Sequence, residues 1–92
     1  MKRVLKWTVP VDDHPHLIGS GKVVHVESIV DPFSVQVWTE EDENSAGPTR
    51  LVNVFGTGHD VPAEATHVGS VVTSMAGSSF ILVWHVYEVT GA

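Results

Sequence analysis

The sequence lacks cysteine and any long apolar run, and each absence excludes a class of protein. Without cysteine, the 92-residue chain can form neither disulfide bridges nor zinc–thiolate sites, which fits a cytoplasmic protein. The longest apolar run, Phe80–Trp84, has the length of a strand, whereas a membrane helix needs roughly 20 residues. Charges at Lys6, Asp12 and Asp13 interrupt the apolar stretch that a signal peptide requires. We therefore expect no membrane partner and no secretion.

Basic residues are also scarce. The chain has five Lys and Arg against eleven Asp and Glu, for a net charge of −6. After residue 22 the only basic residue is Arg50, so most of this acidic protein would repel a phosphate backbone. The charge therefore predicts no nucleic-acid partner.

The apolar residues recur with a period of two, which is typical of strands, and no segment carries a helical stripe. With the turn residues between them, they predict six strands, within residues 5–9, 22–27, 33–38, 49–55, 68–73 and 80–89. We interpret residues 40–48 as an acidic loop, around which the third and fourth strands could form a hairpin. Residues 63–65 are a candidate for one helical turn. The prediction is a single all-β domain over residues 1–92, a compact six-stranded antiparallel sandwich or small barrel with little or no helix.

The last predicted strand, residues 80–89, is apolar on both faces. This pattern fits a strand in the centre of a sheet, or a strand whose outer face meets another subunit. Small domains also gain stability by self-association. We therefore expect a homo-oligomer.

The segment from Val54 to Pro62 contains the sharpest local motif, in which two glycines bracket a threonine and precede a histidine. Glycine allows positive φ and close approach of a ligand to the backbone. The candidate ligand-binding residues here are Gly56, Thr57, Gly58 and His59. The plainer interpretation is that the glycines only shape the exit from the strand. The motif is neither a phosphate loop nor a dinucleotide fingerprint, because no Gly-Lys-Ser/Thr follows it.

A second candidate group lies in the last strand. There, His85 and Tyr87 share one face, and Trp84 lies on the other. An aromatic ring beside a histidine can stack a ligand and bind its edge, although such a pair is more often a core or interface group. Trp84, His85 and Tyr87 therefore complete the hypothetical ligand site.

Metal binding has weak support. His14 and His16 are two residues apart, so an extended backbone would place them on one face. A site would need a third ligand such as His25, His59, His67 or a carboxylate, and the alternative is a solvated loop. We expect no metal and no cofactor.

Catalytic motifs are mostly absent. The chain has no Gly-x-Ser-x-Gly elbow, no cysteine nucleophile and no His-x-Ser or His-x-Thr pair. The carboxylates of residues 40–43 fit a solvated charge run, with mimicry of nucleic-acid phosphates as a minor alternative. We therefore predict a protein that is not an enzyme. The alternative is a small enzyme with His59 or His85 as its base.

Three stretches together resemble a known family. They are residues 3–10 (RVLKWTVP), residues 55–62 (FGTGHDVP) followed by 67–71 (HVGSV), and residues 82–88 (LVWHVYE). Their order and spacing are similar to those of a family of short, uncharacterised proteins of bacteriophages that infect actinobacteria. The resemblance implies a phage product that acts in the host bacterial cytoplasm, and it implies no particular activity.

These observations favour a phage accessory protein that is an oligomeric, non-enzymatic binding module for a host protein or a small molecule. One alternative is a sponge that sequesters a host nucleotide signal. Another is a minor structural protein of the virion.

Overall fold

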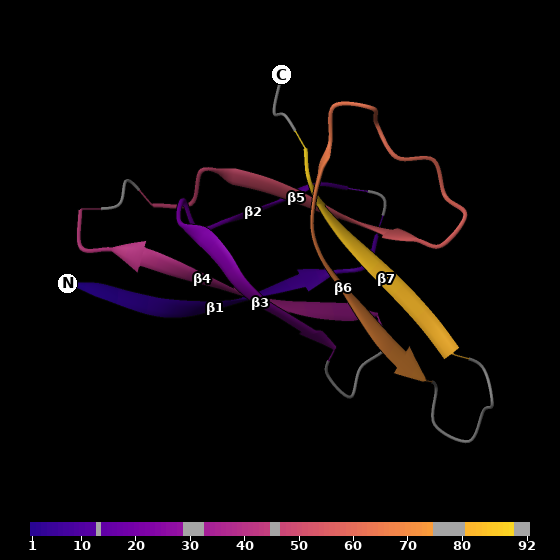
Figure 1. The fold of residues 1–92 in the computed structure, drawn as a ribbon, viewed down its shortest axis with the longest axis horizontal. Coiled ribbons are helices and arrows are strands. Elements are labelled where there is room, and N and C mark those ends of the chain that lie inside the picture. The colour runs from indigo at the N-terminus through magenta and orange to yellow at the C-terminus, as the bar shows by residue number, and fades with distance from the viewer. Residues whose placement is uncertain (13, 29–32, 45–46, 75–80, 90–92) are drawn as a thin grey trace.

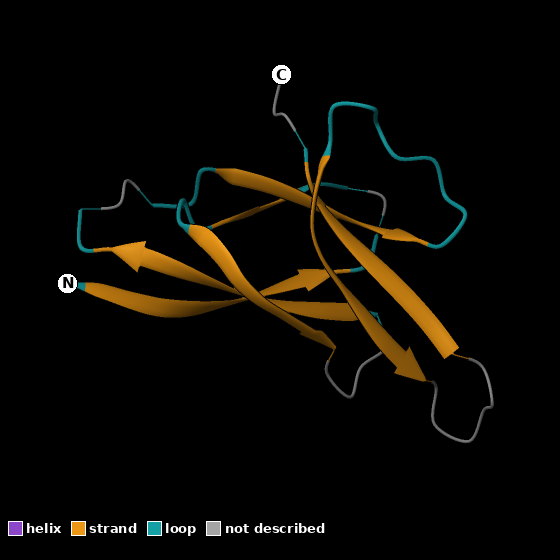
Figure 2. Ribbon diagram, in the orientation of Figure 1, coloured by secondary structure: helices purple, strands orange, loops and turns teal. Residues whose placement is uncertain are grey.

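A computed structural model describes residues 1–12, 14–28, 33–44, 47–74 and 81–89. These residues form strands joined by turns and loops, with no helix (Figures 1 and 2), and so no helix that could cross a membrane. The strands are β1 (Lys2–Pro10), β2 (His16–Ile18), β3 (Lys22–Ser28), β4 (Ser34–Asp42), β5 (Arg50–Gly56), β6 (Thr66–Ser74) and β7 (Ile81–Glu88). The all-β prediction is confirmed.

The strands form two antiparallel sheets, one with the order β1-β4-β3 and the other with the order β2-β5-β7-β6. The sheets do not close into a barrel, so of the two predicted architectures the sandwich is correct. β7 lies between β5 and β6, with Val86 opposite Val54 on one side and Gly69 on the other. The apolar last strand is therefore a central strand, which is one of the two interpretations that its composition allows.

The core between the sheets consists of small aliphatic side chains. Its buried hydrophobic residues are Val9, Ile18, Val35, Val37, Val52, Val54, Val71 and Val86. They alternate along their strands with outward-facing residues, as half-buried strands require. Trp7 and Trp84 pack against this core but are only partly buried. The layer of side chains between the two sheets is thin, because none of the fully buried side chains among the described residues is larger than isoleucine.

The prediction of six strands is wrong by one. The missed strand is β2, which has only three residues and lies between Pro15 and Gly19. It pairs with β5 from His16 opposite Val52 to Ile18 opposite Arg50. A segment this short carries too little alternation to reveal a strand, and its place in the sheet depends on a partner distant in sequence.

The predicted hairpin around the acidic loop is also wrong. β4 and β5 belong to different sheets, so the segment between them crosses from one layer to the other. The loop is shorter than predicted as well, because β4 continues to Asp42. Its acidic end is compatible with a strand because Glu41 points inward, where it is hydrogen-bonded, and Glu40 forms an ion pair with Lys2 over 3.1 Å.

Two smaller boundaries also differ from the prediction. Residues 63–65 lie in a hydrogen-bonded turn and are not helical. The Ala65 N–H donates to the Pro62 carbonyl oxygen over 3.0 Å. β6 begins at Thr66 and contains a bulge between His67 and Gly69. Between the predicted strands, residues 13, 31–32 and 75–79 lie outside the described residues, as does Phe80 at the start of the last predicted strand.

A buried polar chain fixes the turn between β2 and β3 against β4. The Trp7 indole N–H donates to the Thr39 hydroxyl over 2.8 Å, and Thr39 is hydrogen-bonded in turn to Glu41. The Glu41 carboxylate also accepts the Gly21 N–H over 3.0 Å and the Ser20 hydroxyl over 3.2 Å. Led by the one from Thr39, these hydrogen bonds lower the pKa of Glu41 below its ordinary value of 4.5, although burial opposes them. Glu41 is 3% exposed and therefore serves the fold.

One edge of each sheet meets the other along a seam between β3 and β6. The Ser28 hydroxyl donates to the Val72 carbonyl oxygen over 3.3 Å. Gly69 lies directly under Val26, since a Cβ at position 69 would come within 2.5 Å of Val26 Cγ2. The seam therefore depends on the absence of a side chain at this position.

Candidate functional site

The turn after β5 contains Gly56, Thr57, Gly58 and His59, four of the predicted ligand-binding residues. The His59 N–H donates to the Gly56 carbonyl oxygen over 3.1 Å and closes the turn. Gly58 has a φ of 92°, the left-handed value that a type II turn requires at its third position. The Gly56 N–H donates to His59 Nδ1 over 3.3 Å. Because Nδ1 accepts this bond, the neutral imidazole carries its proton on Nε2.

A hollow of about 500 Å³ lies beside this turn. Its lining includes Thr57, His59 and Trp84, and none of the described residues that line it is Asp, Glu, Lys or Arg. The pairing of β5 with β7 ends at Gly56 and Trp84, so residues 81–83 extend past β5 and form a wall of the hollow. Gly56 allows the rings to approach, since a Cβ there would lie 3.2 Å from both His59 Cε1 and Trp84 Cζ3.

A chain of hydrogen bonds crosses the outer face of the four-stranded sheet. The Thr57 hydroxyl lies 2.9 Å from His85 Nε2, and the Ser70 hydroxyl lies 2.9 Å from His85 Nδ1. The same Ser70 oxygen lies 2.8 Å from His67 Nε2. Each hydroxyl and each neutral imidazole can both donate and accept, so these four side chains satisfy one another. Within the described part of the chain, no carboxylate is hydrogen-bonded to them.

Aromatic rings lie next to this chain. Tyr87 follows His85 by two residues and shares its face, while Val86 between them is fully buried. The Tyr87 ring meets Phe55 edge-on with 5.7 Å between centroids, and it meets His67 in the same manner at 5.2 Å. The outer face therefore combines mutually bonded polar groups with rings in edge-to-face contact.

The seven predicted ligand-binding residues thus fall into two groups. The group at the hollow contains Gly56, Thr57, Gly58, His59 and Trp84. The group on the outer face contains His85 and Tyr87, with Thr57 joining the two. Trp84 and His85 fall in different groups because neighbouring residues of β7 point to opposite faces.

His67 and Ser70 complete the polar chain. Sequence reasoning named His67 only as a possible third metal ligand and missed Ser70. Residues three apart in a regular strand point to opposite faces. The bulge between His67 and Gly69 adds one residue, so His67 and Ser70 share a face. The signal that could have found them is the glycine inside a strand pattern, which often marks a bulge.

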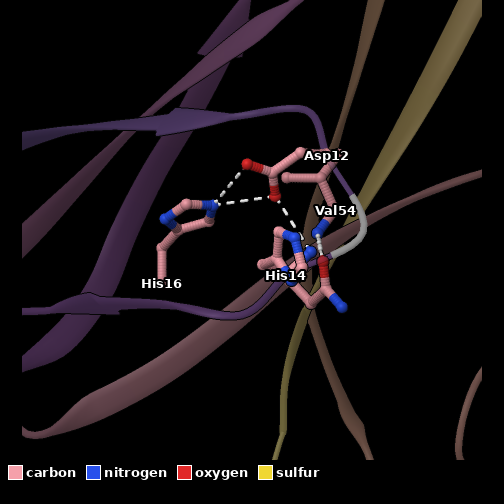
Figure 3. Close-up of polar contacts among 5 residues, drawn as sticks. Asp12, His14, His16 and Val54 are labelled. Carbon is pink, nitrogen blue, oxygen red and sulfur yellow. Dashed lines mark hydrogen bonds and ion pairs between the residues drawn. The ribbon is translucent and has the colours of Figure 1, made fainter.

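The predicted weak metal candidates lie at the start of β2, with His14 before the strand and His16 as its first residue (Figure 3). His16 Nε2 is 2.9 Å and 3.0 Å from the two carboxylate oxygens of Asp12, and the His14 N–H donates to the same carboxylate over 2.9 Å. These bonds, that of His16 first, lower the pKa of the exposed Asp12 carboxyl. The described residues bring no group of three His, Asp, Glu or Cys side chains together, so a site here lacks its third ligand among them.

The outer faces of the two sheets differ in charge. On the four-stranded sheet, alternation along the strands places residues without formal charge outside. This uncharged face consists of Leu17, Leu51, Asn53, Phe55, His67, Ser70, Val72, Ile81, Val83, His85 and Tyr87. On the three-stranded sheet, six charged residues surround Trp38. They define the charged face and are Lys2, Lys6, Lys22, Glu27, Glu40 and Asp42.

Comparison with known proteins identifies a family. A family model described as a domain of unknown function, DUF7352, matches residues 1–92. The chain belongs to this family. No curated protein and no solved structure matches the chain significantly. Family membership agrees with the expected likeness to proteins of unknown activity, and it names no ligand, so the function has to be inferred from the geometry.

Proposed function

We propose that the protein is a non-enzymatic binding module that takes a small, planar, uncharged molecule in the hollow beside the β5 turn. The observation that carries this proposal is the fixed tautomer of His59, whose Nδ1 accepts the Gly56 N–H. The remaining Nε2–H is a donor in a lining that also includes the Trp84 ring and the Thr57 hydroxyl. An apolar wall with a few convergent polar groups is the usual composition of a small-molecule site.

The lining favours an uncharged ligand over a nucleotide. Phosphate groups are bound by Arg, Lys or clustered backbone N–H groups. The described lining contains neither Lys nor Arg, and Arg50 is engaged elsewhere in an ion pair with Glu88 at 3.2 Å. This is an argument against the nucleotide sponge.

The contacts of the histidines support binding rather than catalysis. A histidine that activates a nucleophile hydrogen-bonds to it and is oriented by a third group, often a carboxylate. His59 uses Nδ1 to accept a backbone N–H. His85 is bonded to the hydroxyls of Thr57 and Ser70, and no carboxylate orients it among the described residues. With the motif resemblance, this supports a phage accessory protein that acts in the host cytoplasm.

Native mass spectrometry on protein incubated with a bacterial metabolite extract tests the proposal. We expect one small-molecule mass per chain, lost in Trp84→Leu and retained in Trp38→Leu, which removes the ring at the centre of the charged face. Absence of any added mass, or its retention in Trp84→Leu, would refute the hollow as the binding site.

A further inference from the structure

We propose that the uncharged face binds a second copy of this chain, so that two four-stranded sheets pack face to face about a two-fold axis. This face adjoins the hollow that serves the proposed ligand at Thr57, Ile81 and Val83, and the inference goes beyond that function. In a contact of this symmetry, the same patch of each copy meets its equivalent on the other. Sheets packed in this way lie about 10 Å apart, with interleaved side chains.

Large apolar side chains are exposed on this face. Leu17, Val72 and Ile81 are 56%, 64% and 68% exposed, and the Phe55 and Tyr87 rings lie in edge-to-face contact on the same surface. The buried core of one copy, in contrast, contains only valine and isoleucine among its described hydrophobic residues. Leu17 lies at one end of the face and Val72 and Ile81 lie at the other, with the Phe55 and Tyr87 rings between them. Exposed apolar side chains that gather on one face are typical of an interaction site.

The distribution of charge also favours a contact between two copies at the uncharged face. Two copies that each carry −6 repel one another on most of their surfaces. The uncharged face carries no Asp, Glu, Lys or Arg among its described residues, and the carboxylates of Glu27, Glu64 and Glu88 line hollows at its margin. Copies that meet there therefore oppose no like charges at the centre of the contact. On the charged face, association would instead remove ions from water, which costs free energy unless each finds a partner.

The contact would also bury polar groups. A polar group taken out of water destabilises an interface unless it keeps a hydrogen bond. The side chains of Thr57, His85, Ser70 and His67 are already hydrogen-bonded to one another within one copy. A second copy can therefore cover this chain without breaking its hydrogen bonds.

The area of the face suits a weak dimer. The four strands contain 27 residues in total. At about 3.3 Å per residue and about 4.8 Å between strands, they present about 430 Å² per copy. Two such faces bury about 860 Å², a size typical of weak, transient interfaces.

Sedimentation velocity tests the inference with a matched pair of variants. Val72→Asp places a charge on the uncharged face, and Val24→Asp places the same charge at an exposed position on β3 of the other sheet. We expect a dimer for the wild type and for Val24→Asp. In Val72→Asp, the dimer Kd should rise at least about a hundredfold, because two carboxylates would be buried without partners.

A second variant on the same face, Leu17→Asp, keeps the test decisive if Val72→Asp does not fold. A monomeric wild type, or equal weakening by Val24→Asp, would overturn the inference. Ligand mass measured on the monomeric variant separates this inference from the proposed function. Retention of the ligand supports the hollow whatever the oligomeric state, whereas a dimer without ligand refutes the hollow alone.

Discussion

The two sheets distribute their polar residues in opposite ways. The three-stranded sheet carries charge on its outer face and holds a buried carboxylate, Glu41, on its inner face. The four-stranded sheet has valines inside and a neutral outer face of rings, aliphatic side chains and mutually bonded hydroxyls and imidazoles. Lys2 and Glu40 form an ion pair on the charged face, whereas the described residues of the uncharged face include no ion. The charged face is therefore suited to contact with water, and the uncharged face is suited to contact with another protein surface.

The largest loss of stability should come from removing the buried carboxylate of Glu41 on the inner face of the three-stranded sheet. Glu41→Gln replaces the carboxylate that accepts the Gly21 N–H, the Ser20 hydroxyl and the Thr39 hydroxyl. We expect a loss of about 3 kcal/mol in the free energy of unfolding, because buried donors lose a charged acceptor. Denaturant titration measures this loss.

The control is Glu43→Gln, which changes an exposed carboxylate paired with the N-terminal amine at 3.3 Å. Exposed ion pairs contribute little, so its effect should stay within about 0.5 kcal/mol. Equal effects at the two positions would show that Glu41 is not the anchor of this sheet.

Lowering the pH should weaken the hydrogen bonds of the Glu41 carboxylate in the wild-type protein. The folded pKa of Glu41 lies below its ordinary value of 4.5, so the unfolded chain takes up the proton first. The stabilisation is complete above that ordinary value and is lost as the pH falls through the lowered pKa. Denaturant titrations across this range should show a steeper loss in wild type than in Glu41→Gln. Parallel curves would exclude Glu41 as the source.

The seam between the sheets should be the next most sensitive feature. Gly69→Ala places a methyl group within 2.5 Å of Val26 Cγ2 and should cost about 2 kcal/mol through overpacking. The double variant Gly69→Ala/Val26→Ala should cost less than the sum of the two single changes, because the smaller side chain at position 26 makes room for the new methyl group. Additive losses in thermal unfolding would show that the two residues do not oppose each other.

A smaller effect is expected at the turn that ends β5. Gly58→Ala forces a φ of 92° on a residue with a Cβ and should cost about 1 kcal/mol. Gly58→Asn should cost less, because asparagine tolerates left-handed backbone better than other non-glycine residues. If alanine and asparagine were equally stable at position 58 in thermal unfolding, backbone strain would not explain this glycine.

Local alternation along the chain was enough to predict the strand class, and it allowed the central place of β7 as one of two interpretations. It predicted that His85 and Tyr87 share a face, which the strand register confirms. It could not predict β2, whose three residues become a strand only against β5. It also could not predict that β4 and β5 belong to different sheets, because the pairing of distant strands is not encoded in local periodicity.

For the candidate site as well, local features could be predicted from the sequence, whereas contacts between distant residues could not. The glycine motif correctly indicated a turn with positive φ at Gly58. The hydrogen bond between Thr57 and His85 joins residues 28 positions apart and required the register of β5 against β7. Glu41, read from the sequence as part of a solvated charge run, is buried, because its donors come from β4 itself and the turn before β3.

Hydroxyl-radical footprinting at increasing protein concentration compares the two outer faces most directly. Tyr87 and Trp38 are both partly exposed in a single chain, one on the uncharged face and the other on the charged face. The oxidation rate of Tyr87 should fall as the concentration rises, while that of Trp38 stays constant. The fall should disappear in Val72→Asp. A Tyr87 rate that is independent of concentration in the wild type, from dilute to concentrated solution, would contradict the account.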